Sequence, residues 1–202
     1  MRYTGWDGAR IAGWYIQPAG QGPFPALVVY HGYSGSKGQP HSYFLWTLQG
    51  YAVLAVDTRG QSGASTDPTV YSSGRVKGWM TAGILDLEEY YYRGAYVDCV
   101  RALDVVAARP EVDRARVAVA GMSQGGALTL AVAGLDRRPV LAMPEMPYLC
   151  HFQRAVDVAV RMPYLEIADY YRYHNHEDVP AHWRKKLAWA ERYLTPAPSG
   201  DR

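Results

Sequence analysis

The sequence has few cysteines, no long hydrophobic run and no excess of charge of one sign. Only Cys99 and Cys150 occur in 202 residues, which fits a reducing compartment and excludes a fold held by several disulfides. Apolar runs such as residues 26–30 fall far short of the roughly 18 residues that cross a bilayer. The 21 basic and 19 acidic residues are scattered. We therefore expect a cytoplasmic protein with neither nucleic acid nor a membrane as partner.

Short β-branched segments alternate along the chain with longer segments of helical spacing, which is typical of an α/β fold. Helices on both faces of a mostly parallel sheet follow from this alternation. The length of 202 residues favours one domain over residues 1–202, with residues 195–202 as a tail. The predicted strands are residues 10–17, 24–31, 52–58, 115–121 and 139–143. The predicted helices are residues 41–49, 87–109, 124–135, 152–160, 164–173 and 182–193.

One predicted strand leads directly into a helix through the pattern Gly121-Met122-Ser123-Gln124-Gly125. This G-x-S-x-G pattern is typical of a sharp turn that holds a nucleophilic serine above a sheet. Glycines on both sides relieve the crowding of such a turn, and the helix N-terminus directs free amides toward a developing oxyanion. The alternative interpretation is that Ser123 only caps the helix that follows it.

A second element follows the predicted strand 24–31, where such folds place a loop that donates another oxyanion amide. The loop reads His31-Gly32-Tyr33-Ser34-Gly35. By position, the backbone N–H groups of Tyr33 and Gln124 would hold the oxyanion. His31 precedes the loop, so we expect it to fix the loop by hydrogen bonds, and general-base catalysis by His31 is the alternative.

With these residues in place, the sequence resembles carbohydrate esterase family 7, the acetyl xylan esterases and cephalosporin C deacetylases. The resemblance covers roughly residues 3–170 and comprises several segments in order. They are residues 9–15, His31-Gly32-Tyr33, Arg59-Gly60-Gln61, residues 78–86, residues 90–94, Gly121 to Gly126, Pro147-Tyr148-Leu149 and the positions Phe152, Arg154, Ala155, Asp157 and Val158.

This resemblance implies an α/β-hydrolase fold with Ser123 as nucleophile and the amides of Tyr33 and Gln124 as oxyanion hole. It implies release of acetate from small acetylated substrates, either xylo-oligosaccharides or cephalosporin C. Members of the family are intracellular homo-oligomers, namely hexamers, and need no metal and no cofactor.

The chain departs from the family pattern because the later His-Glu element, which bears the catalytic histidine, does not occur in it. The N-terminal segment of the family is absent as well. We therefore expect a chain truncated at both ends, with an incomplete C-terminal part of the fold and no catalytic acid and histidine. Such a chain would be inactive alone, because Ser123 would lack a base. A triad of Ser123 with Glu145 and His151 is the alternative.

Two other groups have a functional and a structural interpretation. His174, His176 and His182 could bind a metal, although a polar loop between helices fits their spacing better. Arg59 could touch substrate, whereas a buried guanidinium paired with a carboxylate is the interpretation that we favour. Two rival functions also stay open: a hydrolase of another acyl or peptide specificity, and a non-catalytic binding or assembly fragment.

Overall fold

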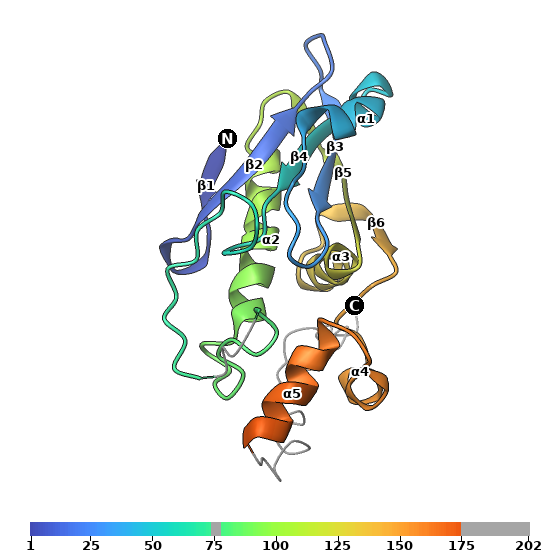
Figure 1. Cartoon of the computed structure of the whole chain (residues 1–202). Coiled ribbons are helices and arrows are strands. Elements are labelled where there is room, and N and C mark those ends of the chain that lie inside the picture. The colour runs from blue at the N-terminus through green and yellow to red at the C-terminus, as the bar shows by residue number, and fades with distance from the viewer. Residues whose placement is uncertain (74–77, 175–202) are drawn as a thin grey trace, which may run out of the picture. The chain divides into compact units, whose positions relative to one another are not determined.

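The computed structural model describes residues 1–73 and 78–174 (Figure 1). They fall into two compact units, each described here by itself. The first unit contains residues 1–70 and 92–151, and the second contains residues 71–91 and those from 152 onward. The single domain expected from the length stays a prediction.

A six-stranded sheet forms the first unit, with the strand order β1-β2-β4-β3-β5-β6. The two strands β1 and β2 pair antiparallel, and β2 pairs antiparallel with β4, whereas all other neighbours are parallel. The mostly parallel sheet is thus as predicted, while the three-residue strand β1 was too short for the sequence pattern to reveal. The strands are β1 (Arg2–Thr4), β2 (Arg10–Ile16), β3 (Phe24–Tyr30), β4 (Ala52–Val56), β5 (Val112–Met122) and β6 (Pro139–Glu145).

The helices agree with the predicted ones except near two N-termini. Residues 40–43 form a 3₁₀ turn before α1, and the helix predicted from residue 87 begins only at Tyr91. The N–H of Glu88 donates to the Asp86 carboxylate at 2.8 Å, so a side chain offers this segment a local turn in place of helix. The helix predicted at 182–193 lies outside the described residues. The helices are η1 (Trp6–Gly8), η2 (Pro40–Tyr43), α1 (Phe44–Leu48), α2 (Tyr91–Ala107), α3 (Gln124–Leu135), α4 (Phe152–Val158) and α5 (Tyr164–His174).

Side chains on β3 alternate between the two faces of the sheet, and each face meets different elements. Tyr30 lies on the face of α2, where its hydroxyl donates to the carbonyl oxygen of Cys99 at 3.0 Å. Leu27 lies on the opposite face, in a cluster with Val53 and Ala118 against which Tyr43 packs. The sheet therefore carries α2 and α3 on one face and the segment of η2 and α1 on the other (Figure 1).

The stripe predicted on α2 forms the buried side of that helix. Tyr92, Cys99, Leu103 and Val106 are each at most 3% exposed. Tyr96 is half-buried, and its ring centroid lies 5.9 Å from that of Tyr92. Spacing of three and four residues was sufficient to identify this face.

The second unit is built from residues 78–91 and the helices α4 and α5. Its interior contains Met80, Ala82, Ile84 and Ile167, all fully buried. The carboxylate of Glu166 on α5 is buried beside this segment and accepts a hydrogen bond from the N–H of Met80 at 3.2 Å. The segment 78–86, part of the resemblance described above, therefore has a packed structure of its own.

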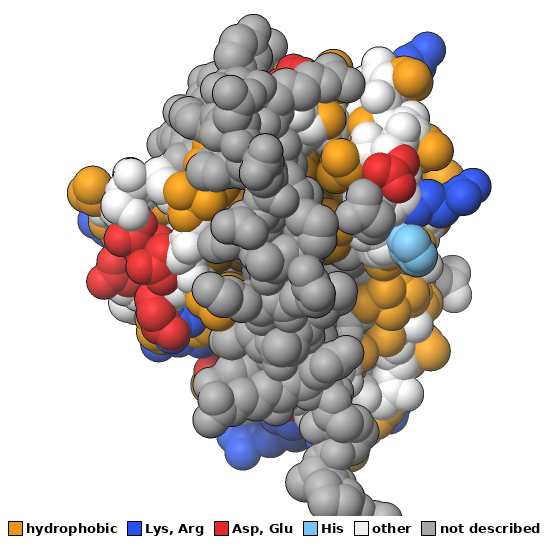
Figure 2. Space-filling view, turned by 90° about the horizontal axis from the view of Figure 1, so that it is seen from below, with side chains coloured by type: hydrophobic (Ala, Val, Ile, Leu, Met, Phe, Trp, Pro, Cys, Tyr) orange, Lys and Arg blue, Asp and Glu red, His pale blue; other side chains and the backbone are white. Residues whose placement is uncertain are grey.

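Charged side chains of both signs lie on the surface, as the similar numbers of basic and acidic residues indicate. In Figure 2, acidic and basic side chains form small groups near the edges of the face, among hydrophobic side chains. Within residues 1–73 and 78–174, no helix is long and apolar enough to cross a bilayer.

Candidate functional site

The backbone turns sharply at Ser123, between the end of β5 and the start of α3. Its dihedral angles are φ 57° and ψ −116°, in a region that a residue with a Cβ rarely adopts. The side chain is half-exposed and makes no capping hydrogen bond to α3. The alternative that Ser123 merely caps the helix is therefore wrong. Surrounding contacts must hold this strained conformation in place.

Three glycines allow backbone segments to meet around the turn. A Cβ on Gly125 would lie 2.0 Å from the carbonyl oxygen of Tyr30, and one on Gly126 would lie 2.7 Å from that of Glu145. A Cβ on Gly121 would lie 2.5 Å from the backbone of Gly125. These positions accept only glycine because the opposing atoms are backbone, as the sequence pattern indicated.

Backbone hydrogen bonds from the segment that ends β6 fix the same turn. The N–H of Ser123 donates to the carbonyl oxygen of Glu145 at 2.9 Å, and the N–H of Tyr148 donates to that of Ser123 at 2.9 Å. The side chain of Glu145 is exposed, so this residue contributes to the turn through its carbonyl. Within residues 1–73 and 78–174, no side chain hydrogen-bonds to the Ser123 hydroxyl, so the alternative triad with Glu145 and His151 is not formed in this structure.

The loop that follows β3 lies next to the turn. Tyr30 pairs with Gly121 across the parallel strands, so β3 and β5 end at the same edge of the sheet. A Cβ built on Gly32 would lie 3.9 Å from the Cβ of Ser123. The three predicted site residues Tyr33, Ser123 and Gln124 thus meet at one edge. As the first residue of α3, Gln124 has an N–H without an intrahelical partner, at the positive end of the helix.

His31 holds this loop through both ring nitrogens. Its Nε2 accepts the N–H of Thr58 at 2.8 Å, which leaves Nδ1 as the protonated nitrogen that donates to the Gly32 carbonyl at 2.7 Å. Burial lowers the pKa of His31, although the Gly32 hydrogen bond opposes this effect. A neutral imidazole with both nitrogens engaged cannot accept the proton of Ser123, so the structure supports the positional role.

Two buried glutamine side chains link the loop to the turn, and sequence reasoning missed this contact. The Nε2 of Gln61 donates to the Oε1 of Gln124 at 2.8 Å, and the Nε2 of Gln124 donates in return at 3.1 Å. The Oε1 of Gln61 also accepts the N–H of Ser34 at 2.9 Å. On α2, Tyr92 donates its hydroxyl to the Oε1 of Gln124 at 2.9 Å. The only signal in the sequence was the segment Arg59-Gly60-Gln61.

Arg59 is 1% exposed and has a structural role, as we favoured. Its Nε and Nη2 donate to the two oxygens of Asp98 at 2.7 and 3.0 Å, and Nη2 also donates to the carbonyl oxygen of Trp6 at 2.8 Å. A Cβ on Gly94 would lie 2.6 Å from the Nη1 of Arg59, so a glycine in α2 makes room for the guanidinium. The buried pair joins the segment that follows β4 to α2 and to the N-terminal segment.

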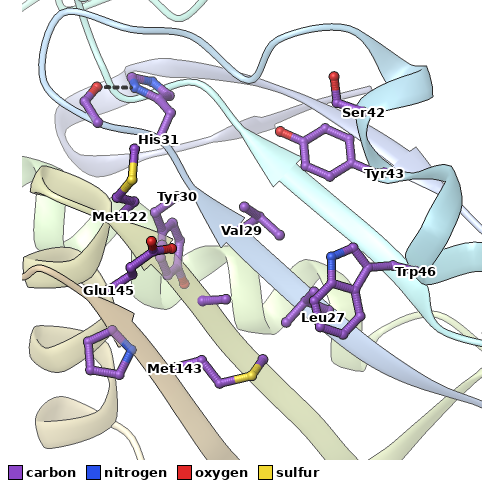
Figure 3. A pocket seen from close by; sticks show the side chains of 14 residues that line it. Leu27, Val29, Tyr30, His31, Ser42, Tyr43, Trp46, Met122, Met143 and Glu145 are labelled. Atoms are coloured by element: carbon purple, nitrogen blue, oxygen red, sulfur yellow. Dashed lines mark hydrogen bonds between the residues drawn. The ribbon is translucent and has the colours of Figure 1, made fainter.

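A pocket of about 650 Å³ lies beside the turn (Figure 3). Its walls are largely apolar and come from the face of the sheet that carries Leu27. Met122 and Gly32 line the end near the site, while Ser123 is not a lining residue. The pocket therefore borders the turn without containing the serine. The other lining side chains in Figure 3 include Val29, Ser42, Tyr43, Trp46, Met143 and Glu145.

The histidines for which a polar loop was favoured over a metal site are not described by the structure. The side chain of His174, together with His176 and His182, lies outside the described part of the chain. Among the described residues, no group of three or more His, Cys, Asp or Glu side chains is arranged to hold a metal.

A family model and a curated relative both indicate the same family for this chain. A family model described as acetyl xylan esterase (AXE1) matches residues 1–192. The acetyl esterase Axe7A of Xylanibacter ruminicola is 32% identical over 145 residues, which are 69% of this chain and 33% of that protein.

Two solved structures share the fold. The acetyl xylan esterase from Paenibacillus sp. R4 has a TM-score of 0.88 and 48% identity, covering 93% of this chain and 61% of that one. Acetyl xylan esterase 1 from Thermoanaerobacterium sp. JW/SL YS485 has a TM-score of 0.84 and 34% identity, covering 96% and 61%. The chain thus spans about three fifths of the length of these structures and a third of the curated relative.

Proposed function

Because the chain belongs to the acetyl xylan esterase family and has its α/β-hydrolase fold, we propose that it carries the nucleophile and oxyanion hole of a serine acetylesterase. The observation that supports this most directly is the strained turn at Ser123. Its half-exposed hydroxyl lies at the carboxyl edge of a parallel sheet, beside a second loop and a helix N-terminus. Ligand sites of open α/β sheets lie at this edge.

In the proposed reaction, the Oγ of Ser123 attacks the carbonyl carbon of an acetyl ester. The N–H groups of Tyr33 and Gln124 donate to the resulting oxyanion, which lowers the barrier because the donors need no reorganisation. A base takes the serine proton and passes it to the sugar oxygen as the ester bond breaks. The sugar leaves as an alcohol, and the acetyl group remains on Ser123. Water then attacks this intermediate, so acetate leaves and Ser123 regains its proton.

The base and the acid of this triad are proposed to lie outside residues 1–202. This proposal rests on the family pattern described above. Within residues 1–73 and 78–174, no side chain hydrogen-bonds to the Ser123 hydroxyl, and the chain spans 61% of each of the two solved relatives. An unactivated serine is a weak nucleophile, so the 202 residues alone should turn over esters slowly.

Small acetylated sugars are the proposed substrates, with cephalosporin C as a second candidate. The relatives named above are esterases of acetyl groups, and two of them are named for xylan. A cytoplasmic location and a homo-oligomer, a hexamer as in the family, are proposed on the same resemblance.

The test measures acylation of the serine and does not depend on turnover. The chain is incubated with p-nitrophenyl acetate, with and without imidazole as an external base, and digested for mass spectrometry. We expect one acetyl group on the peptide that contains Ser123, formed faster with imidazole. It should be absent in Ser123→Ala and retained in Ser72→Ala, in which an exposed serine of the second unit is changed.

Two results would change the proposal. If neither condition acetylates Ser123, the esterase assignment fails and a non-catalytic fragment becomes the better interpretation. If Ser123 supports rapid multiple turnover without imidazole, the chain contains its own base and the proposed absence of that base is wrong.

A further inference from the structure

The orientation of the two buried amides of Gln61 and Gln124 can be deduced from one backbone group. A backbone N–H can only donate, so the atom of Gln61 that faces Ser34 must be the oxygen. The nitrogen of Gln61 then faces Gln124 and requires the oxygen of that side chain as its acceptor. Because that oxygen also faces Tyr92, the tyrosine hydroxyl must be a donor. The donors and acceptors of these hydrogen bonds can therefore be assigned in only one way.

This arrangement connects the two backbone segments that supply the oxyanion donors. Ser34 directly follows Tyr33, and its N–H is held by Gln61. Gln124 directly follows Ser123, and its side chain is held by Gln61 and Tyr92 together. The exposed fractions are 7% for Gln61 and 0% for both Gln124 and Tyr92, so water does not compete for these hydrogen bonds. A shift of either segment would break these buried hydrogen bonds, at a cost in free energy.

We propose that Tyr92 and Gln61 are positioning residues, which hold the N–H groups of Tyr33 and Gln124 at a fixed separation through the buried amide pair. This inference rests on the proposed function, since it assigns those two N–H groups to the oxyanion hole. Neither side chain touches the reacting atoms. The side chain of Gln124 is likewise fully buried, so its contribution to the reaction comes from its backbone.

The first test removes one hydroxyl and observes a residue that this hydroxyl does not touch. In Tyr92→Phe, we expect the amide of Ser34 to exchange with solvent about fivefold faster, as measured by NMR, because loss of one buried hydrogen bond loosens the pair. Tyr3→Phe is the matched control: the Tyr3 hydroxyl donates to the Asp98 carbonyl oxygen at 2.8 Å, away from the pair. Equal effects of the two variants at Ser34, or none in Tyr92→Phe, would overturn the proposal.

The second test uses a side chain whose hydrogen-bonding pattern changes with pH. In Gln61→Glu, the protonated carboxyl reproduces the amide: its carbonyl oxygen accepts from Ser34 and its hydroxyl donates to Gln124. The ionised carboxylate places an oxygen against the oxygen of Gln124, which breaks the pair. We therefore expect the Ser34 and Gln124 amide chemical shifts to match wild type at low pH and to depart from it as the carboxyl ionises. Shifts that differ from wild type at every pH, or at none, would contradict the assigned arrangement.

The acylation assay separates this inference from the proposed function. If wild type is acetylated at Ser123, Tyr92→Phe should slow acylation about fivefold or more, while Tyr3→Phe leaves it unchanged. An unaffected rate in Tyr92→Phe removes the positioning role and keeps the esterase. If wild type is not acetylated, the esterase assignment fails, and the NMR measurements still decide whether the pair couples Ser34 to Gln124.

Discussion

The guanidinium of Arg59 and the carboxylate of Asp98 form a two-bond ion pair in the interior of the first unit. Their side chains are 1% and 5% exposed. Removing one partner of a buried pair leaves the other charge without compensation.

We expect Arg59→Met to lower the free energy of unfolding by about 3–5 kcal/mol, as measured by urea denaturation. The matched control is Arg116→Met, because Arg116 pairs with Asp113 at 2.6 Å while its side chain is 55% exposed. That variant should lose less than about 1 kcal/mol. Similar losses in the two variants would show that the Arg59 pair is not a structural centre.

Two glycines in α3 should respond oppositely to the same substitution. Gly125→Ala places a methyl group 2.0 Å from the carbonyl oxygen of Tyr30, so backbone must move, and we expect a loss of at least about 3 kcal/mol. Gly134→Ala lies on the exposed side of the helix, where alanine should add about 0.5–1 kcal/mol. Thermal unfolding followed by circular dichroism compares them. A tolerated Gly125→Ala would mean that α3 does not approach β3 this closely.

His31 should make stability depend on pH near neutrality. Because its pKa is lowered in the folded state, its contribution is complete above the unfolded pKa of about 6.5 and is lost as the pH falls below that value. Below pH 6.5, titration of His31 should lower the free energy of unfolding of the wild type by up to about 1.4 kcal/mol per pH unit. His31→Gln should remove that slope, whereas His41→Gln, at an exposed histidine, should preserve it. Denaturation midpoints are measured from pH 5 to 8. If the dependence of stability on pH is the same in His31→Gln as in wild type, the prediction is wrong.

Asp57 should make the stability of the fold depend on pH in a more acidic range. Its carboxylate is buried, which alone would raise its pKa, but hydrogen bonds from Lys37 and the N–H of Ala64 bring the pKa below its usual value. Its contribution is therefore complete above the unfolded pKa of about 3.9 and is lost as the pH falls toward the folded value. Acid unfolding of Asp57→Asn should begin from lower stability and depend less on pH below 4. The opposite order, with a steeper loss in Asp57→Asn, would show that Asp57 is not stabilised as an anion.

Local composition predicted most of the fold because the central strands β3 and β4 are short runs of mostly apolar residues that turn residues separate from the helices. The helix predicted at 124–135 has these bounds in the structure, since it starts at the glycine-rich turn and consists mostly of small and apolar residues. The start of α2 was placed four residues too early because the turn at Asp86 depends on a side-chain hydrogen bond that propensity does not register.

The candidate site was only partly predictable. The pattern around Ser123 identified the turn, because tight turns constrain residue types locally. The pair formed by Gln61 and Gln124 joins residues 63 positions apart, and nothing in either local sequence indicates a partner. Likewise, Arg59 could be recognised as a candidate ion pair, whereas its partner Asp98 could be found only from the packing of α2.

The turn at Ser123 is joined to β6, one of the two edge strands of the described sheet, through the Ser123 N–H and the carbonyl of Glu145. Val140 and Leu141 on that strand are 67% and 52% exposed. Fraying of this edge strand would therefore weaken the backbone hydrogen bonds that fix the conformation of Ser123.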